Sequence, residues 1–175
     1  MRWIKAWLSN RGQRVCLQGH TSGWRVVTSG VPQGSVLGPI LFLIFIDDLD
    51  ADITNSILKF ADDTKLYGKV NNEENRKQLQ KDLDRLVDWT REWQMEFNID
   101  KCKVMHIGKR NTNFTYEMEG KMLQTTKIER DLGIQVSADL KNSQQCRQAY
   151  GKASQMLAMV ARTITSRDPY ISQII

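Results

Sequence analysis

The longest apolar run in the chain, residues 36–46 (VLGPILFLIFI), constrains the fold more than any other feature. It has eleven residues and contains Gly38 and Pro39. A membrane-spanning helix needs ~20 apolar residues, so the run predicts a helix over residues 39–49 that lies in a protein core. The preceding stretch, GVPQGSVLGP, is rich in glycine and proline and predicts a loop up to Pro39. Proline fits the first helical position, where its missing N–H has no partner in any case.

Length and composition set the class of protein. The chain has 175 residues, of which 41% are hydrophobic and 26% charged, which excludes a collagen, a wholly disordered chain and a disulfide-built scaffold. Cys16, Cys102 and Cys146 are far apart and lack C-x-x-C spacing, which favours a reducing compartment and argues against structural zinc. Residues 1–12 lack the pattern of a signal peptide. We therefore expect an intracellular protein of the nucleus or cytoplasm, not secreted and without a membrane segment.

The chain has a formal net charge of +5, and its charges are unevenly distributed along the sequence. Residues 1–60 carry a net +2, residues 61–100 a net −3 and residues 101–175 a net +6, and no Asp or Glu precedes Asp47. An acidic centre between basic ends fits a cation site flanked by polyanion-binding surfaces. From charge alone, however, a solvated face of a helix is the favoured explanation of the acidic centre.

Hydrophobic periodicity predicts an α+β protein. Helices are expected over residues 1–10, 39–49, 73–97 and 142–163, the last one burying Cys146, Ala149, Ala153, Met156, Leu157 and Val160. Strands are expected at 14–18 and 24–29 (a hairpin around a turn at 19–23), 57–61, 64–68, 102–107, 114–118, 122–125 and 128–136, with a turn at Glu119-Gly120. Residues 168–175 begin another apolar segment and then stop, as if the chain were cut.

Asp62 and Asp63, in the sequence FADDT, are the main candidates for chemistry. Two carboxylates at the tip of a hairpin place hard oxygen ligands side by side, as Mg²⁺ prefers. Asp-Asp is also common in turns simply because it caps backbone groups. A second pair, Asp47-Asp48, ends the apolar helix and has no strand hairpin around it. We therefore interpret these two aspartates as solvent-exposed surface residues.

Two loops are further candidates. The glycines of GVPQG allow close backbone approach to a ligand, and Gln33 offers hydrogen bonds to a base or sugar; a tight connector explains the loop as well. In NIDKCK, Lys101 and Lys103 follow Asn98 at a helix-to-strand junction. Lysines at this position are suited to contacts with phosphate groups. Lysines that are simply exposed to solvent at a turn explain the pattern as well.

Four motifs in order give the chain a family resemblance: the loop and helix over residues 30–49, F-A-D-D at 60–63, Asn-x-x-Lys at 98–101 and Leu-Gly at 132–133. With these spacings the chain closely resembles the reverse transcriptases of non-LTR (LINE-type) retrotransposons, in the jockey-like and chicken-repeat-like group. The resemblance covers essentially the whole chain. It implies a reverse-transcriptase palm, an antiparallel sheet with packed helices, over residues 1–136, and the start of a truncated helical thumb over residues 137–175.

The resemblance also assigns roles to residues. It implies that Asp62 and Asp63 are two catalytic, metal-binding aspartates and that Lys101 acts on the leaving pyrophosphate. It further implies contacts to nucleotide and template from Gln33, Gly34 and Phe60. Leu132 and Gly133 would form the primer grip. The cofactor would be two Mg²⁺ or Mn²⁺ ions. The partners would be an RNA template, a DNA primer and deoxynucleoside triphosphates, while protein partners stay unknown.

One departure from the family stands out. The family's first palm motif, which carries a third catalytic aspartate, would precede the segment that matches residue 1, so we expect the fingers and the first palm strand to be absent. A two-metal site without that carboxylate should bind metal poorly. We therefore expect an RNA-directed DNA polymerase fragment that is inactive in isolation. The alternatives are a non-catalytic nucleic-acid-binding remnant of a mobile element and, less well supported, another two-metal phosphotransferase.

Overall fold

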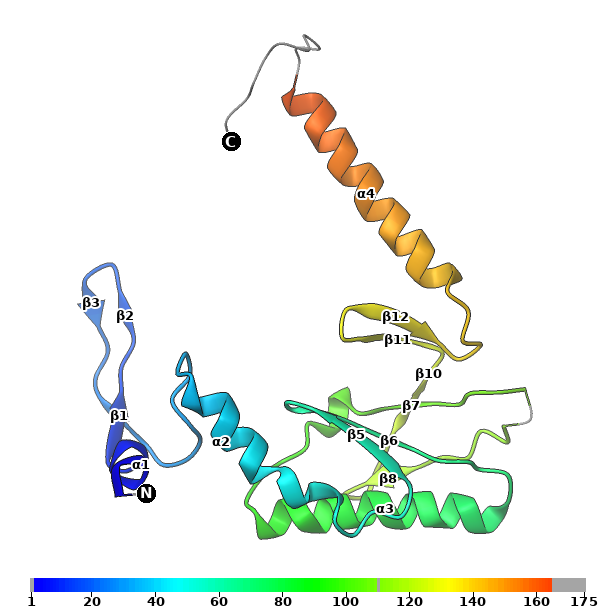
Figure 1. Cartoon of the computed structure of the whole chain (residues 1–175), viewed down its shortest axis with the longest axis horizontal. Coiled ribbons are helices and arrows are strands. Elements are labelled where there is room, and N and C mark those ends of the chain that lie inside the picture. The colour runs from blue at the N-terminus through cyan, green and yellow to red at the C-terminus, as the bar shows by residue number, and fades with distance from the viewer. Residues whose placement is uncertain (1, 110, 165–175) are drawn as a thin grey trace. The chain divides into compact units, whose positions relative to one another are not determined.

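The computed structural model describes residues 2–109 and 111–164. They belong to two compact units, Met1–Gly68 and Lys69–Ile175, which are described separately below (Figure 1). The apolar segment predicted at 168–175 lies outside the described residues. No helix in the described ranges has the length and apolar character needed to cross a membrane.

The first unit combines short helices with two β-hairpins. Its elements are α1 (Arg2–Leu8), β1 (Arg11–Gln13), β2 (Cys16–Leu17), β3 (His20–Thr21), β4 (Arg25–Val27), α2 (Leu37–Phe45), the 3-10 helix η1 (Asp47–Asp50), β5 (Ser56–Phe60) and β6 (Asp63–Tyr67). The predicted N-terminal helix and both hairpins are confirmed.

The strands β1 to β4 form one long two-stranded ribbon. β1 pairs with β4 and β2 with β3, both antiparallel. The ribbon closes at Gln18 and Gly19, whose φ angles are 48° and 82°, as in the type I′ turns that suit the twist of paired strands. The predicted turn at 19–23 is therefore too long, because this two-residue turn lets pairing continue to Thr21.

Helix α2 begins two residues before the predicted start at Pro39. The Ser35 hydroxyl accepts the N–H of Gly38 at 2.9 Å and donates to the carbonyl of Pro32 at 2.8 Å. The hydroxyl thus satisfies a backbone donor of the first turn, as a cap does. Pro39 then occupies the third helical position, where an N–H would also lack an intrahelical partner.

The prediction that this helix lies in a core is wrong for most of its length. Ile40, Leu43 and Ile44 are exposed, and Gly38 is the buried residue of α2. Burial resumes just after the helix, at Ile46 and Leu49. Sequence hydrophobicity indicated that the helix needs cover, but of the helix itself only Gly38 is buried.

The second unit is built around a long helix and several short strands. Its elements are α3 (Glu73–Glu92), the 3-10 helix η2 (Ile99–Lys101), β7 (Lys103–Met105), β8 (Glu117–Met118), β9 (Lys121–Met122), β10 (Gln124–Thr126), β11 (Ile128–Asp131), β12 (Ile134–Ser137) and α4 (Ser143–Thr163). The predicted helices and the turn at Glu119-Gly120 are confirmed.

Helix α3 has clear signals at both ends. Asn72 caps it by accepting the N–H of Asn75 at 2.8 Å. The helix ends five residues before the predicted Phe97, because Gln94 adopts a left-handed φ of 54° and the N–H of Met95 returns to the carbonyl of Thr90 at 2.9 Å. This is the usual way in which a helix C-terminus satisfies its last carbonyls.

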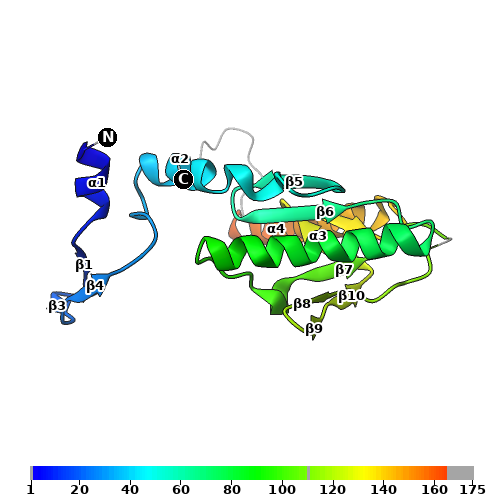
Figure 2. The same ribbon diagram turned by 90° about the horizontal axis from the view of Figure 1, so that it is seen from below.

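The core of the second unit lies between α3 and β8. Leu86 and Val87 of α3 are buried, as are Tyr116 and Met118. The side-chain amide of Gln80 joins the two elements, because it accepts the N–H of Glu117 at 3.1 Å and donates to the Glu117 carbonyl at 2.9 Å. Figure 2 shows β8 alongside α3.

The expected antiparallel palm sheet is not what the described strands form. They pair as six two-stranded sheets, of which five are antiparallel and one, β7 with β10, is parallel. The segment expected as one strand over 128–136 is the hairpin β11–β12. Two-residue turns close four hairpins, in which a short strand pairs with its neighbour in sequence: β2–β3, β5–β6, β8–β9 and β11–β12. The α+β composition holds.

The predicted burial along α4 is also wrong. The helix has no buried residue, and Cys146, Met156, Leu157 and Val160 are exposed. Its first turn is attached to β12, where the side chain of Gln145 accepts the N–H of Gln135 at 2.8 Å. The apolar periodicity predicted the helix correctly but says nothing about whether the chain supplies a surface to cover it.

Candidate functional site

Asp62 and Asp63 lie at the tip of the β5–β6 hairpin. The strands pair from Ser56 opposite Tyr67 to Phe60 opposite Asp63, so the loop consists of Ala61 and Asp62 alone. Ala61 has a φ of 51°, a left-handed conformation that such turns more often give to glycine. The pairing register therefore places these two adjacent carboxylates at the end of the ribbon.

Both carboxylates at the tip are exposed, and the ring of Phe60 beside them is 62% exposed. Leu58 lies on the same strand face and is also exposed. Ile57 and Lys59 occupy the opposite, half-buried face. The tip thus offers two hard oxygen donors and an aromatic surface to a ligand.

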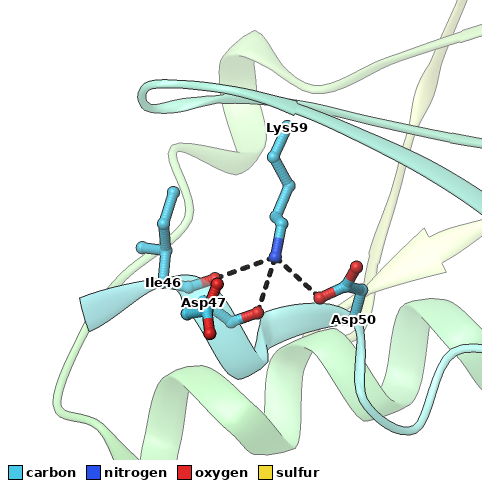
Figure 3. A network of polar contacts seen from close by, with 4 residues as sticks. All are labelled: Ile46, Asp47, Asp50 and Lys59. Atoms are coloured by element: carbon cyan, nitrogen blue, oxygen red, sulfur yellow. Dashed lines mark hydrogen bonds and ion pairs between the residues drawn. The ribbon is translucent and has the colours of Figure 1, made fainter. Parts of the chain in front are cut away.

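Lys59 attaches this hairpin to the end of α2, as Figure 3 shows. Its ammonium group donates to the carbonyls of Ile46 at 3.1 Å and Asp47 at 2.8 Å, and to the carboxylate of Asp50 at 2.6 Å. The carbonyls belong to the C-terminal end of the helix, where a cation is favoured by the helix dipole. The hydrogen bond from Lys59 holds the pKa of Asp50 below its ordinary value.

Sequence reasoning missed Lys59. The signal was a lysine at the inward position of an alternating strand, three residues before Asp62. A charge on the half-buried face of a strand needs partners, and the ends of α2 and η1 supply them. The surface interpretation of Asp47 and Asp48 holds, since both are exposed.

The loop of GVPQG leads into the opposite end of α2. Gln33 and Gly34 form an exposed turn, and Gly34 has a φ of 78° with open space at its Cβ position. By contrast, a Cβ on Gly38 would lie 2.9 Å from the Ser35 hydroxyl and 3.1 Å from the Pro32 carbonyl. The glycine at 38 is thus required by packing, whereas Gln33 and Gly34 are free to meet a ligand.

Lys101 and Lys103 differ in their surroundings. Lys101 ends η2 and is exposed, while its N–H bonds to the carbonyl of Asn98 at 3.0 Å. Lys103 donates to the carbonyl of Asp100 at 3.1 Å and to the side chain of Gln124. The Asn-x-x-Lys segment therefore forms one 3-10 turn that leaves Lys101 exposed to solvent. Lys103, by contrast, is hydrogen-bonded to Asp100 and Gln124.

Leu132 and Gly133 form the two-residue turn between β11 and β12, with φ angles of 45° and 89°. Leu132 is exposed. The hairpin is secured where it meets α4, because the Ser137 hydroxyl donates to Asp139 at 2.6 Å. That bond lowers the pKa of Asp139.

The candidate residues thus form local groups. Phe60, Asp62 and Asp63 share one hairpin tip in the first unit, and Gln33 and Gly34 share one turn of the same unit. The second unit contains Lys101 in η2 and the Leu132-Gly133 turn. Within the described ranges, no three His, Cys, Asp or Glu side chains are grouped so that they could hold a metal ion.

Comparison with known proteins decides the family. Residues 1–147 match the family described as reverse transcriptase (RNA-dependent DNA polymerase). The chain belongs to the reverse transcriptase family. The predicted resemblance is thereby confirmed, and the relatives place it with jockey-like elements.

Several relatives of similar sequence come from fly mobile elements. The chain is 28% identical over 149 residues to the RNA-directed DNA polymerase from mobile element jockey of Drosophila melanogaster. This match covers 78% of the chain and 16% of the relative. It is 36% identical over 107 residues to a probable RNA-directed DNA polymerase from transposon BS of the same fly, covering 56% of this chain and 12% of the relative. The jockey polymerase of Drosophila funebris is 33% identical over 108 residues, covering 57% of this chain and 12% of the relative.

This reverse transcriptase segment therefore spans about a sixth of the length of the curated relatives or less. No solved structure matches it. The region matched to the family includes all the candidate residues and the first residues of α4.

Proposed function

We propose that the chain is part of an RNA-directed DNA polymerase of a jockey-like mobile element. In this proposal, residues 1–136 contribute to the palm and residues 137–175 begin the thumb. The longer enzyme joins a primer 3′-hydroxyl to a deoxynucleoside triphosphate opposite an RNA template, in the nucleus or the cytoplasm. The observation that carries the proposal is the exposed Asp62-Asp63 pair at a two-residue hairpin tip, in a chain matched to the family over residues 1–147.

The donor set at the tip suits a divalent cation such as Mg²⁺ or Mn²⁺. Mg²⁺ is usually held by one or two carboxylates together with substrate phosphates and waters, and Asp62 and Asp63 supply two adjacent carboxylates with open solvent around them. A bound metal pair would activate the attacking hydroxyl and stabilise the leaving oxygen. The described residues bring no third carboxylate to this tip, so we expect weak metal binding and little or no polymerase activity from the 175 residues alone.

The other candidate residues have supporting roles in this proposal. Phe60 provides an aromatic surface beside the incoming nucleotide, and the Gln33-Gly34 turn lies against the template. Lys101 supplies a positive charge to the leaving pyrophosphate, while the Leu132-Gly133 turn helps to hold the primer end. Each of these residues lies in an exposed turn or at the exposed end of a strand, where it is available to a substrate.

Primer extension tests the proposal. The longer polymerase that contains this segment is assayed on an RNA template with Asp63→Asn and, as a matched control, Asp47→Asn. Asp47 is exposed and uses its backbone carbonyl to bind Lys59, so changing its carboxylate should leave extension intact. Asp63→Asn should abolish extension. Full activity of the Asp63→Asn enzyme would refute the proposal.

A second candidate is a non-catalytic nucleic-acid-binding remnant of a mobile element. It is favoured by the absence of any Asp or Glu before Asp47 and by the net charge of +5. This candidate predicts that the 175-residue chain binds an RNA–DNA duplex with an affinity that falls steeply with salt. Lack of binding at low salt would exclude it.

A further inference from the structure

The ribbon formed by β1 to β4 carries an exposed aromatic ring stacked with a cation. The guanidinium of Arg14 lies 4.8 Å from the ring centroid of Trp24, within cation–π range. The indole is nevertheless 67% exposed. The tryptophan thus leaves an aromatic surface open to a ligand.

Strand pairing determines which residues share the face of Trp24. Gly12 pairs with Val26, and Gln13 pairs with Arg25. Since neighbouring residues of a strand point to opposite faces, Gly12, Arg14, Trp24 and Val26 share one face, which we term the Trp24 face. Arg25 points to the other.

Gly12 makes room for the indole on this face. A Cβ at Gly12 would lie 3.3 Å from the Cε3 atom of Trp24, so the ring rests directly over the glycine. Arg14, beside it, is exposed, and Val26 is 80% exposed. The Trp24 face therefore combines an aromatic plane, a guanidinium plane and an exposed apolar side chain.

The charges around the Trp24 face select an anionic partner. The described residues 2–46 contain no Asp or Glu. Arg11 is engaged within the unit, since it donates to the carbonyls of Leu8, Ser29 and Gly30, whereas Arg14 remains exposed on the ring. An indole and an arginine plane together, in a segment of the chain without acidic residues, suit unpaired bases and their phosphates.

We propose that the Trp24 face binds single-stranded RNA by stacking an unpaired base on the Arg14–Trp24 pair. A duplex would not serve, because its bases are already stacked on one another and cannot reach the ring. That the strand is RNA rests on the proposed function, since an RNA-templated enzyme must hold unpaired template. The stacking itself requires neither metal nor polymerase activity.

Fluorescence anisotropy of a short, labelled oligouridylate with the 175-residue chain tests this, in chelator so that no metal site contributes. Stacking on an aromatic side chain contributes about 1–3 kcal/mol per base, which corresponds to roughly fivefold to 150-fold in Kd. We expect Trp24→Leu to weaken binding by at least about fivefold, while Trp24→Phe retains most of the affinity because it keeps an aromatic face. The matched control, Trp3→Ala, removes another exposed tryptophan and should leave Kd unchanged.

Two arginine variants separate stacking from general charge attraction. Arg14→Gln and Arg25→Gln remove the same charge from opposite faces of one ribbon, so Arg14→Gln should weaken binding more. Equal effects of the two, or equal affinities of Trp24→Leu and the parent chain, would overturn the proposal. A dimer in sedimentation velocity that Trp24→Leu dissociates would also overturn it, because the face would then be a protein interface.

The Trp24 face and the β5–β6 hairpin that carries the polymerase proposal share no residue, so the two proposals fail separately. Loss of extension in Asp63→Asn with unchanged binding in Trp24→Leu would uphold the proposed function and refute the Trp24 face. Far-UV circular dichroism of each variant verifies that the chain remains folded. The high exposure of Trp24 makes a folding defect in Trp24→Leu or Trp24→Phe unexpected.

Discussion

The ammonium nitrogen of Lys59 lies 2.6 Å from the carboxylate oxygen Oδ1 of Asp50. The same nitrogen donates to the carbonyls of Ile46 and Asp47, so one side chain holds the β5–β6 hairpin to the end of α2. This attachment gives the hairpin tip with Asp62 and Asp63 a defined base. The ammonium group of Lys59 thus makes three hydrogen bonds three residues before Asp62.

Removing this ammonium group should loosen the hairpin. Lys59→Met keeps the aliphatic stem but leaves two carbonyls and one carboxylate without their donor. Since Lys59 and Asp50 are partly exposed, we expect a loss of about 1–2 kcal/mol in the free energy of unfolding, measured by urea denaturation. Lys77→Met is the control, because its pair with Glu73 is fully on the surface, and it should cost clearly less than Lys59→Met. Equal losses would contradict the account.

The same pair predicts a dependence of stability on pH. Lys59 lowers the pKa of Asp50 in the folded chain, so the pair stabilises the fold above the unfolded pKa of about 4. The contribution is lost as pH falls through the lower, folded value. The difference in unfolding free energy between the parent chain and Asp50→Asn should thus be constant near neutral pH and shrink in acid. A difference that grows on acidification would show that the pKa is not lowered.

Gly38 and Gly151 should respond to alanine in opposite ways. A Cβ at Gly38 would lie 2.9 Å from the hydroxyl of Ser35 and 3.1 Å from a backbone carbonyl, whereas Gly151 in α4 has open space. We expect Gly38→Ala to destabilise by about 1–3 kcal/mol because the close-packed loop must shift. Gly151→Ala should stabilise the helix by up to about 1 kcal/mol. Thermal unfolding measures both, and a neutral Gly38→Ala would show that the loop is not closely packed.

Lys101 and Lys103 form a matched pair for the reaction itself. In the longer polymerase, Lys101→Ala should lower kcat by roughly 100-fold if the lysine stabilises charge on the leaving pyrophosphate. Lys103→Ala should have little effect on kcat, because Lys103 is occupied by Asp100 and Gln124. Single-nucleotide incorporation kinetics separate kcat from KM. A larger kcat effect at Lys103 would reverse the assignment.

Local features of the structure could be predicted where a turn determined them. The predicted Glu119-Gly120 turn has two positive φ angles, and a glycine at its second position favours this geometry. The Leu132-Gly133 turn has the same geometry, but periodicity missed it and indicated one strand over residues 128–136. The Asp62-Asp63 hairpin followed from apolar segments on both sides. The start of α2 was missed because the Ser35 hydroxyl, two residues before the helix, supplies an early acceptor.

Burial was the part that sequence periodicity could not predict. Ile40, Leu43 and Ile44 of α2 have the hydrophobicity of core residues, and so have Met156 and Leu157 of α4, yet all five are exposed. Periodicity reports which residues need cover, whereas burial depends on whether other elements provide it. Asp82 shows the reverse, because it is fully buried on α3 beside Arg85 and Gln78, although nothing in its local sequence predicts burial.

In the proposed enzyme, Asp62 and Asp63 hold the catalytic metal, and a change of ligand type at position 63 examines this role by itself. Asp63→Cys in the longer polymerase replaces a hard oxygen by a soft sulfur, which binds Mg²⁺ poorly but accepts softer metals such as Cd²⁺. The account predicts that primer extension on an RNA template is lost with Mg²⁺ and partly restored when Cd²⁺ is added, while Asp63→Ala is not restored. Extension by Asp63→Cys at the parent rate with Mg²⁺ would contradict it.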